Sequence, residues 1–249
     1  METTILNSIV SKKLQGKKQL AILIDPDKAN AKYLEKISSY AEKLHADLFL
    51  VGGSLLTDGD LDKTVSTLKS LTRIPIVIFP GSSNQISRAA DGILFLSLLS
   101  SRNPEMLIGK QVIAAPYIRK TQLEPISTAY LLIDSGAATT ASYMSNSNPI
   151  PANKAEIAAS TALAGEYLGM NLIYLDGGSG AQNPIPAEMI EKVSSYTSKP
   201  IIIGGGINSV EKLNTAYQAG ADMVVIGNAF EKDPDFAEAL IAARESMSV

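Results

Sequence analysis

Eight short, almost continuous apolar runs recur along the chain. They are rich in Val, Ile, Leu and Phe and do not alternate with polar residues, as is typical of parallel strands that are buried on both faces. Segments with helical periodicity separate most of them. Strands are therefore expected at residues 20–24, 47–51, 74–79, 92–96, 129–133, 171–175, 200–204 and 222–227. Helices are expected at 29–44, 58–71, 153–168, 186–197, 209–219 and 232–246.

This repeated strand-helix order predicts an α/β fold, a closed (β/α)₈ TIM barrel of the phosphate-binding type. An open doubly wound sheet would show similar local patterns, but the chain reads DPDK after the first strand, where that fold carries a dinucleotide fingerprint. No linker rich in Pro, Gly or Ser divides the chain, so residues 1–249 are expected to form one domain. The irregular stretch 135–152 is expected to be a long loop at the catalytic face.

One repeat is unusually short. Only residues 80–91, PGSSNQISRAAD, separate the third and fourth strands. A full helix with two loops hardly fits in this length. The third outer helix is therefore expected to be short or missing. A missing helix would leave a groove for a long apolar ligand, whereas a helix of about two turns would have no functional meaning.

Composition limits the partners. The chain has 22 Lys+Arg against 25 Asp+Glu, so its net charge of −3 provides no positive field for a nucleic acid or an anionic membrane. It has no cysteine, which fits the cytoplasm and excludes disulfides and thiolate metal sites. We expect neither a signal peptide nor a transmembrane segment. The single histidine, His45, is expected to have a structural role.

Glycine-rich turns follow the last three strands. Glycine lets backbone N–H groups approach an anion closely, and a following helix N-terminus adds partial positive charge. The loops after strands seven and eight are the usual phosphate site of such barrels, although glycine would also ease a tight turn. The turns are Tyr174-Leu175-Asp176-Gly177-Gly178-Ser179-Gly180, Gly204-Gly205-Gly206-Ile207 and Gly227-Asn228-Ala229.

Carboxylates follow strands one and six. Asp25 follows the first strand, and Ser54 follows the neighbouring second strand. The two side chains could share a hard cation such as Mg²⁺ if a polyphosphate supplied further ligands. A helix cap formed by Asp25-Pro26-Asp27 explains these residues equally well, and Asp27 resembles the cap. Asp176 is expected to point at the ligand that the glycine turns hold, with a hydroxyl as its partner, or to accept hydrogen bonds within its own loop.

Six motifs together resemble the geranylgeranylglyceryl phosphate synthase family. They occur in the family's order and at the matching strand ends along almost the whole chain. No single motif would suffice for this assignment. The motifs are IDPDK at 24–28, VGGSLLT at 51–57, FPGS at 79–82, YLDGGSGA at 174–181, GGGI at 204–207 and VIGNAFEKDP at 225–234.

The resemblance implies transfer of a prenyl group from a prenyl diphosphate to the 3-hydroxyl of sn-glycerol 1-phosphate, with geranylgeranyl diphosphate as the expected donor. It implies Mg²⁺ as cofactor, a homo-oligomer (dimer or hexamer), a barrel without a regular third outer helix, and a transient membrane contact for the lipid product. Asp25 and Ser54 would lie at the metal and the diphosphate. Asp176 would orient the glycerol hydroxyl and accept its proton. The glycerol phosphate would be held by Tyr174, Leu175, Asp176, Gly177, Gly178, Ser179, Gly180, Gly205, Gly206, Gly227 and Asn228.

The sequence departs from the family pattern at two positions. Many members carry glutamate in place of Asp176, and some bacterial relatives carry lysine in place of Leu23. A sugar-phosphate isomerase or cyclase is an alternative, because such barrels also bind phosphate at similar turns. A barrel that binds phosphate or lipid without catalysis is another alternative.

Overall fold

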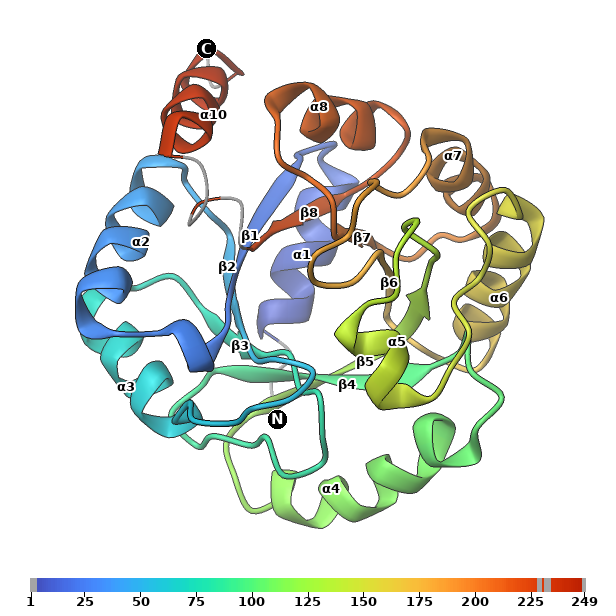
Figure 1. Cartoon of the computed structure of the whole chain (residues 1–249), viewed down its shortest axis with the longest axis horizontal. Coiled ribbons are helices and arrows are strands. Elements are labelled where there is room, and N and C mark those ends of the chain that lie inside the picture. Colours follow the sequence, from blue (N-terminus) through green and yellow to red (C-terminus); the bar gives the residue numbers. More distant parts are fainter. Residues whose placement is uncertain (1–3, 228–229, 231–233, 248–249) are drawn as a thin grey trace.

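The computed structural model describes residues 4–227, 230 and 234–247. Eight parallel strands form a closed barrel in sequence order, with β8 pairing with β1 (Figure 1). All eight strands predicted from the apolar runs are confirmed. They are β1 (Gln19–Ile24), β2 (Leu48–Val51), β3 (Ile76–Ile78), β4 (Gly92–Leu98), β5 (Glu124–Leu132), β6 (Leu172–Asp176), β7 (Ile201–Gly204) and β8 (Met223–Ile226).

Helices surround the barrel (Figure 1). The six predicted helices are confirmed as α2 (Ala31–Lys43), α3 (Leu61–Leu71), α6 (Ala155–Tyr167), α7 (Ala187–Tyr196), α8 (Val210–Gln218) and α10 (Pro234–Met247). The sequence patterns did not predict α1 (Thr4–Leu14), α4 (Lys110–Ile118) or the π-helical turn η2 (Glu105–Gly109) that leads into α4. The expected loop at 135–152 is wrong in part, because it contains the short helix α5 (Thr140–Ser145).

The apolar runs are continuous because the two faces of each strand pack against different cores. On β2, Leu48 and Leu50 point into the barrel interior, whereas Phe49 and Val51 pack against the outer helices. All four side chains are buried. Burial of both faces removes the polar alternation seen in half-exposed sheets.

The connection between β3 and β4 contains turns but no helix. This confirms the expectation of a missing third outer helix and excludes the short helix that was its alternative. No helix from the β3–β4 connection therefore separates α3 from α4. Residues 80–86 instead line a cavity at this point of the barrel wall.

The helix α1 closes the barrel at the end opposite the expected catalytic face. Ile5 and Ile9 pack into the interior core. The buried carboxylate of Glu124, at the start of β5, accepts hydrogen bonds of 2.8 Å and 2.9 Å from the N–H groups of Ile5 and Leu6. This carboxylate caps the helix N-terminus and complements its partial positive charge.

Candidate functional site

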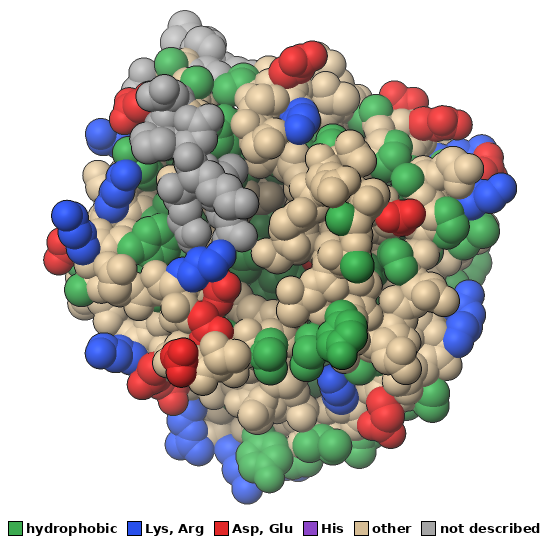
Figure 2. All heavy atoms as spheres, viewed as in Figure 1, with side chains coloured by type: hydrophobic (Ala, Val, Ile, Leu, Met, Phe, Trp, Pro, Cys, Tyr) green, Lys and Arg blue, Asp and Glu red, His purple; other side chains and the backbone are tan. Residues whose placement is uncertain are grey.

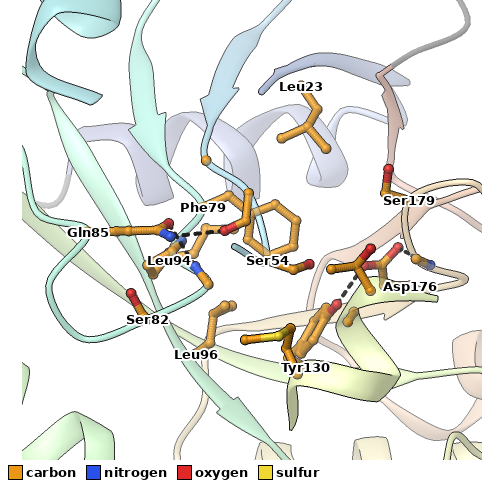
Figure 3. Close-up of a pocket in the computed structure, with 18 of the residues that line it drawn as sticks. Leu23, Ser54, Phe79, Ser82, Gln85, Leu94, Leu96, Tyr130, Asp176 and Ser179 are labelled. Carbon is orange, nitrogen blue, oxygen red and sulfur yellow. Dashed lines mark hydrogen bonds between the residues drawn. The ribbon is translucent and has the colours of Figure 1, made fainter. Parts of the chain in front are cut away.

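One large cavity, of about 680 Å³, lies at the carboxyl ends of the strands. Its polar end is lined by the turns after β1, β2, β6, β7 and β8. From there it passes the 80–86 segment and continues between β4 and α4. Figure 3 shows Ser54, Phe79, Tyr130 and Asp176 around the region where these two parts meet.

Glycines with positive φ shape the polar end. Gly178 has φ +83° and Gly205 has φ +88°, conformations that favour glycine. A Cβ at Gly205 would lie 3.0 Å from the backbone of Gly177, so the turns after β6 and β7 touch backbone to backbone. Gly206 has φ +73°, and its Cβ would lie 2.7 Å from Asn183 and Pro184. These turns form a concave backbone surface of the kind that binds phosphate.

Asp176 lies at the end of β6 with only 7% of its surface exposed. Its Oδ2 accepts a 2.5 Å hydrogen bond from the hydroxyl of Tyr130, and its Oδ1 accepts a 2.8 Å bond from the N–H of Gly178 (Figure 3). Burial raises the pKa of Asp176, while the two hydrogen bonds oppose that rise. The predicted loop-stabilising role is confirmed, and the raised pKa also makes this carboxylate a stronger base.

Three aromatic rings lie beside Asp176. The ring centroid of Phe79 is 5.0 Å from that of Tyr174 and 5.8 Å from that of Tyr130. Burial, followed by the charge of Asp176, raises the pKa of both tyrosines well above the usual value. Both phenols therefore stay protonated at neutral pH and can act as hydrogen-bond donors.

Asp25 and Ser54 both line the polar end of the cavity, as predicted. Asp25 also caps the short 3₁₀ helix η1 (Pro26–Lys28), because its Oδ1 accepts a 3.1 Å bond from the N–H of Asp27. Its Oδ2 lies 3.9 Å from Nζ of Lys28. The carboxylate is about one third exposed, so it remains accessible to a ligand in the cavity.

The expectation that Asp27 is the cap is wrong. Its carboxylate points to the β2–α3 loop instead, where it accepts hydrogen bonds from Thr57 and from the N–H groups of Asp58 and Gly59. These bonds lower the pKa of Asp27, led by the one from the Thr57 backbone. Asp27 thus fixes the loop that follows Ser54.

The second part of the cavity is apolar. Ile93 and Phe95 project from the outer face of β4 toward α4, which contributes Ala114 and Ile118. Leu94 and Leu96, on the inner face of β4, line the part nearer Tyr130 (Figure 3). We call this part the β4–α4 groove. It occupies the region left open by the missing third outer helix.

Basic side chains do not gather around this opening on the face seen in Figure 2. Lysine and arginine side chains are scattered over that face, and several acidic side chains lie next to one another left of its centre. No helix in the described part of the chain is both long and apolar enough to span a membrane.

A sequence model described as the PcrB family matches residues 13–245. The chain belongs to the PcrB family. Among curated relatives, the geranylgeranylglyceryl phosphate synthase of Chitinophaga pinensis is 49% identical over 94% of this chain and 92% of its own length. That of Pyrococcus horikoshii is 42% identical over 92% of this chain and 90% of its own length.

Solved structures share the fold of this chain. The crystal structure of (S)-3-O-geranylgeranylglyceryl phosphate synthase from Thermoplasma acidophilum, in complex with sn-glycerol-1-phosphate, has a TM-score of 0.90 and 36% identity. The match covers 99% of this chain and 98% of that one. An N-acetylmannosamine-6-phosphate 2-epimerase from Clostridium perfringens shares only the fold, with a TM-score of 0.56 and 13% identity over 93% of each chain.

The structure of this PcrB protein brings most of the expected phosphate-binding residues to the cavity. They are Tyr174, Asp176, Gly178, Ser179, Gly180, Gly205, Gly206 and Gly227. Leu175 does not line it, because its side chain is buried against the outer helices. Gly177 also lies behind the surface, where its N–H donates to the carbonyl of Gly204. Asn228 lies outside the described residues.

Tyr130 and Gln85 are among the polar residues of this PcrB site that sequence reasoning missed. Tyr130 is inside an apolar strand, so only its inward register toward the barrel mouth could have indicated it. Gln85 lies in the short 80–91 segment, where a single glutamine gives no sequence signal for a buried role. The apolar lining from α4 was missed because that helix was not predicted.

Proposed function

We propose that this protein transfers a prenyl group from a prenyl diphosphate to the 3-hydroxyl of sn-glycerol 1-phosphate, with release of pyrophosphate. One observation carries the proposal: a single cavity joins a glycine-lined polar end to the apolar β4–α4 groove. An amphiphilic donor and a small phosphorylated acceptor would fit such a cavity side by side. The names of the relatives, and the acceptor bound to the Thermoplasma acidophilum enzyme, support this reading.

In this proposal, the glycine turns hold the phosphate of the acceptor through backbone N–H groups. Tyr174 and Asp176 line the same cavity, and we assign them to the glycerol hydroxyls. Asp176 orients the attacking hydroxyl and takes its proton as the carbon–oxygen bond forms. Its raised pKa suits this role, because a more basic carboxylate accepts a proton more readily near neutral pH.

We further propose that Asp25 and Ser54 hold Mg²⁺ together with the diphosphate of the donor. The oxygen donors fit a hard cation, which commonly uses one or two protein carboxylates and takes its other ligands from phosphate and water. Among the described residues, no group of three or more His, Asp or Glu side chains is arranged to hold a metal. Bound Mg²⁺ would neutralise the charge that develops on the leaving pyrophosphate.

The β4–α4 groove argues against a sugar-phosphate isomerase or cyclase, because a small polar substrate does not need it. A barrel that only binds its ligands would not require a buried carboxylate with a raised pKa beside the phosphate turns. The homo-oligomeric state and the cytoplasmic location expected from the sequence stay predictions.

The experiment that tests the proposal is product formation from radiolabelled sn-glycerol 1-phosphate with C15, C20 and C35 prenyl diphosphates. Each donor is tested with and without Mg²⁺, and sn-glycerol 3-phosphate serves as the control acceptor. We expect a metal-dependent ether product from the first acceptor only. The Asp25→Asn variant should need more Mg²⁺ for half-maximal rate. No product with any donor would exclude the transferase and favour a binding barrel or an isomerase.

A further inference from the structure

The turn after β2 and the segment after β3 touch backbone to backbone. A Cβ on Gly52 would lie 1.9 Å from the carbonyl oxygen of Phe79, and a Cβ on Gly81 would lie 2.2 Å from that of Gly53. Neither position can accept a larger residue without movement of the backbone. The turn that contains Ser54 therefore packs directly against the backbone at the start of the 80–91 segment.

Gln85 connects these two segments through both ends of its side-chain amide. Its Oε1 accepts a 2.9 Å hydrogen bond from the N–H of Gly81, and its Nε2 donates a 3.0 Å bond to the carbonyl of Gly53 (Figure 3). Only this orientation of the amide satisfies one donor and one acceptor. Gln85 is 6% exposed and, like Ser54, lines the cavity. Such buried hydrogen bonds are costly to lose.

The bond to Gly53 has a consequence for Ser54. The peptide group between Gly53 and Ser54 is planar, so fixing its carbonyl toward Gln85 directs the N–H of Ser54 to the opposite side. A glycine at position 53 would otherwise let this peptide rotate easily. The 80–91 segment has no helix that could hold the turn in another way.

We propose that Gln85 is a positioning residue that locks the Gly53–Ser54 peptide in the orientation that binds the diphosphate of the prenyl donor. The identity of that ligand rests on the proposed function. Gln85 acts through the turn and does not supply the binding group itself. Its loss should weaken diphosphate binding while the phosphate turns after β6 and β7, which it does not contact, keep their affinity.

The test uses the full chain and measures binding by isothermal titration calorimetry. The probes are inorganic pyrophosphate with Mg²⁺ and, separately, sn-glycerol 1-phosphate. Gln85→Met keeps the size of the side chain and removes both hydrogen bonds, so the Kd for pyrophosphate should rise roughly 5- to 50-fold. Gln85→Glu keeps the acceptor for Gly81 but loses the donor to Gly53, and we expect a rise at least as large. The Kd for sn-glycerol 1-phosphate should change less than about twofold.

Gln19→Met is the matched control. Gln19 is also buried, and its Nε2 donates to the carbonyl of Ile9, but it lies at the opposite end of the barrel. This variant should lower the melting temperature and leave both Kd values unchanged. In turnover assays, Gln85→Met should raise the KM of the prenyl diphosphate without a matching rise for the acceptor.

Two results from the Gln85 variants would overturn the inference. One is wild-type affinity for pyrophosphate in both Gln85 variants, and the other is an equal loss for both probes, which would mean general damage to the fold. A wild-type chain that binds no pyrophosphate would also reject it. If the wild-type chain binds pyrophosphate but transfers no prenyl group, the proposed function fails, and the comparison of Gln85 variants still decides the positioning role.

Discussion

The hydroxyl of Tyr130 donates a 2.5 Å hydrogen bond to Oδ2 of Asp176 at the mouth of the barrel. The register of β5 and β6 pairs Tyr130 with Tyr174 and Leu132 with Asp176. The Tyr130 side chain on β5 therefore reaches across to Asp176 at the end of β6. Its bond lowers the pKa of Asp176 against the raising effect of burial. Tyr130 therefore helps to set the pH at which Asp176 becomes a base.

Replacing Tyr130 with Phe removes this donor and leaves the ring in place. The pKa of Asp176 should then rise further, because the ionised carboxylate loses one of its two hydrogen bonds. The acidic limb of the pH profile of kcat should therefore move to higher pH. A limb that stays in place, or moves to lower pH, would show that Asp176 is not the titrating base.

Asp176→Asn should separate activity from stability. Removal of the base should lower kcat by about 10²- to 10⁴-fold. The same change should raise the melting temperature near neutral pH, because the folded pKa of Asp176 lies above the usual 3.8 and its ionised form is destabilised by burial.

The stability difference between this variant and the wild type depends on pH. Below the unfolded pKa the carboxyl is protonated in both states and the penalty is absent, so the two proteins should melt at similar temperatures at pH 3. The difference should grow as the pH rises from the unfolded pKa to the folded pKa and should be constant above the folded pKa. Melting curves by circular dichroism at several pH values measure it. A variant less stable than the wild type at pH 8 would contradict the assigned direction of the pKa shift.

Gly205→Ala should weaken acceptor binding selectively. The new methyl group would lie 3.0 Å from the backbone of Gly177 and would push apart the turns after β6 and β7. We expect the KM for sn-glycerol 1-phosphate to rise tenfold or more, on the order of 1.4 kcal/mol of binding, with a smaller effect on the donor. Gly169→Ala is the control, because Gly169 has φ +84° with open space around it and lies outside the cavity. An equal rise of KM in the control would point to backbone strain alone.

Ala114→Trp should shorten the donor that the protein accepts. Ala114 lies on α4 and lines the β4–α4 groove, so an indole there would fill the space for the distal isoprene units. The ratio of kcat/KM for C20 donor to that for C10 donor should fall by tenfold or more, on the scale of about 1.4 kcal/mol. Ala115→Trp is the matched control, since Ala115 is exposed on the same helix and does not line the cavity. Unchanged chain-length preference in Ala114→Trp would place the prenyl chain elsewhere.

The barrel and the polar end of the site could be predicted because they depend on local patterns. Strands buried on both faces produce continuous apolar runs, and glycines with positive φ, such as Gly205, mark the turns where the backbone must bend tightly. The contribution of Tyr130 could not be read in this way. A tyrosine within an apolar strand is compatible with simple core packing, and its partner Asp176 is 46 residues away.

The helix α1 illustrates the same limit. Its N-terminus is capped by Glu124, which lies more than a hundred residues later in the chain. Its lysines pair with Asp47 and Asp222, which directly precede β2 and β8, so these ion pairs form only when the barrel is assembled. Without these distant partners, a helix as short as α1 has little stability in water. Its sequence therefore predicts no more than a weak apolar stretch, and the helix depends on the completed barrel.

Closure of the barrel floor by Ile5 and Ile9 has a kinetic consequence. A ligand that spans both parts of the cavity can enter and leave only on the side of the strand ends, because the interior below is filled. The proposed product would carry the phosphate of one substrate and the hydrocarbon tail of the other, and would hold both positions at once. Such a product should compete with each substrate for its site. Release of the product, and not bond formation, would then limit the rate of each cycle.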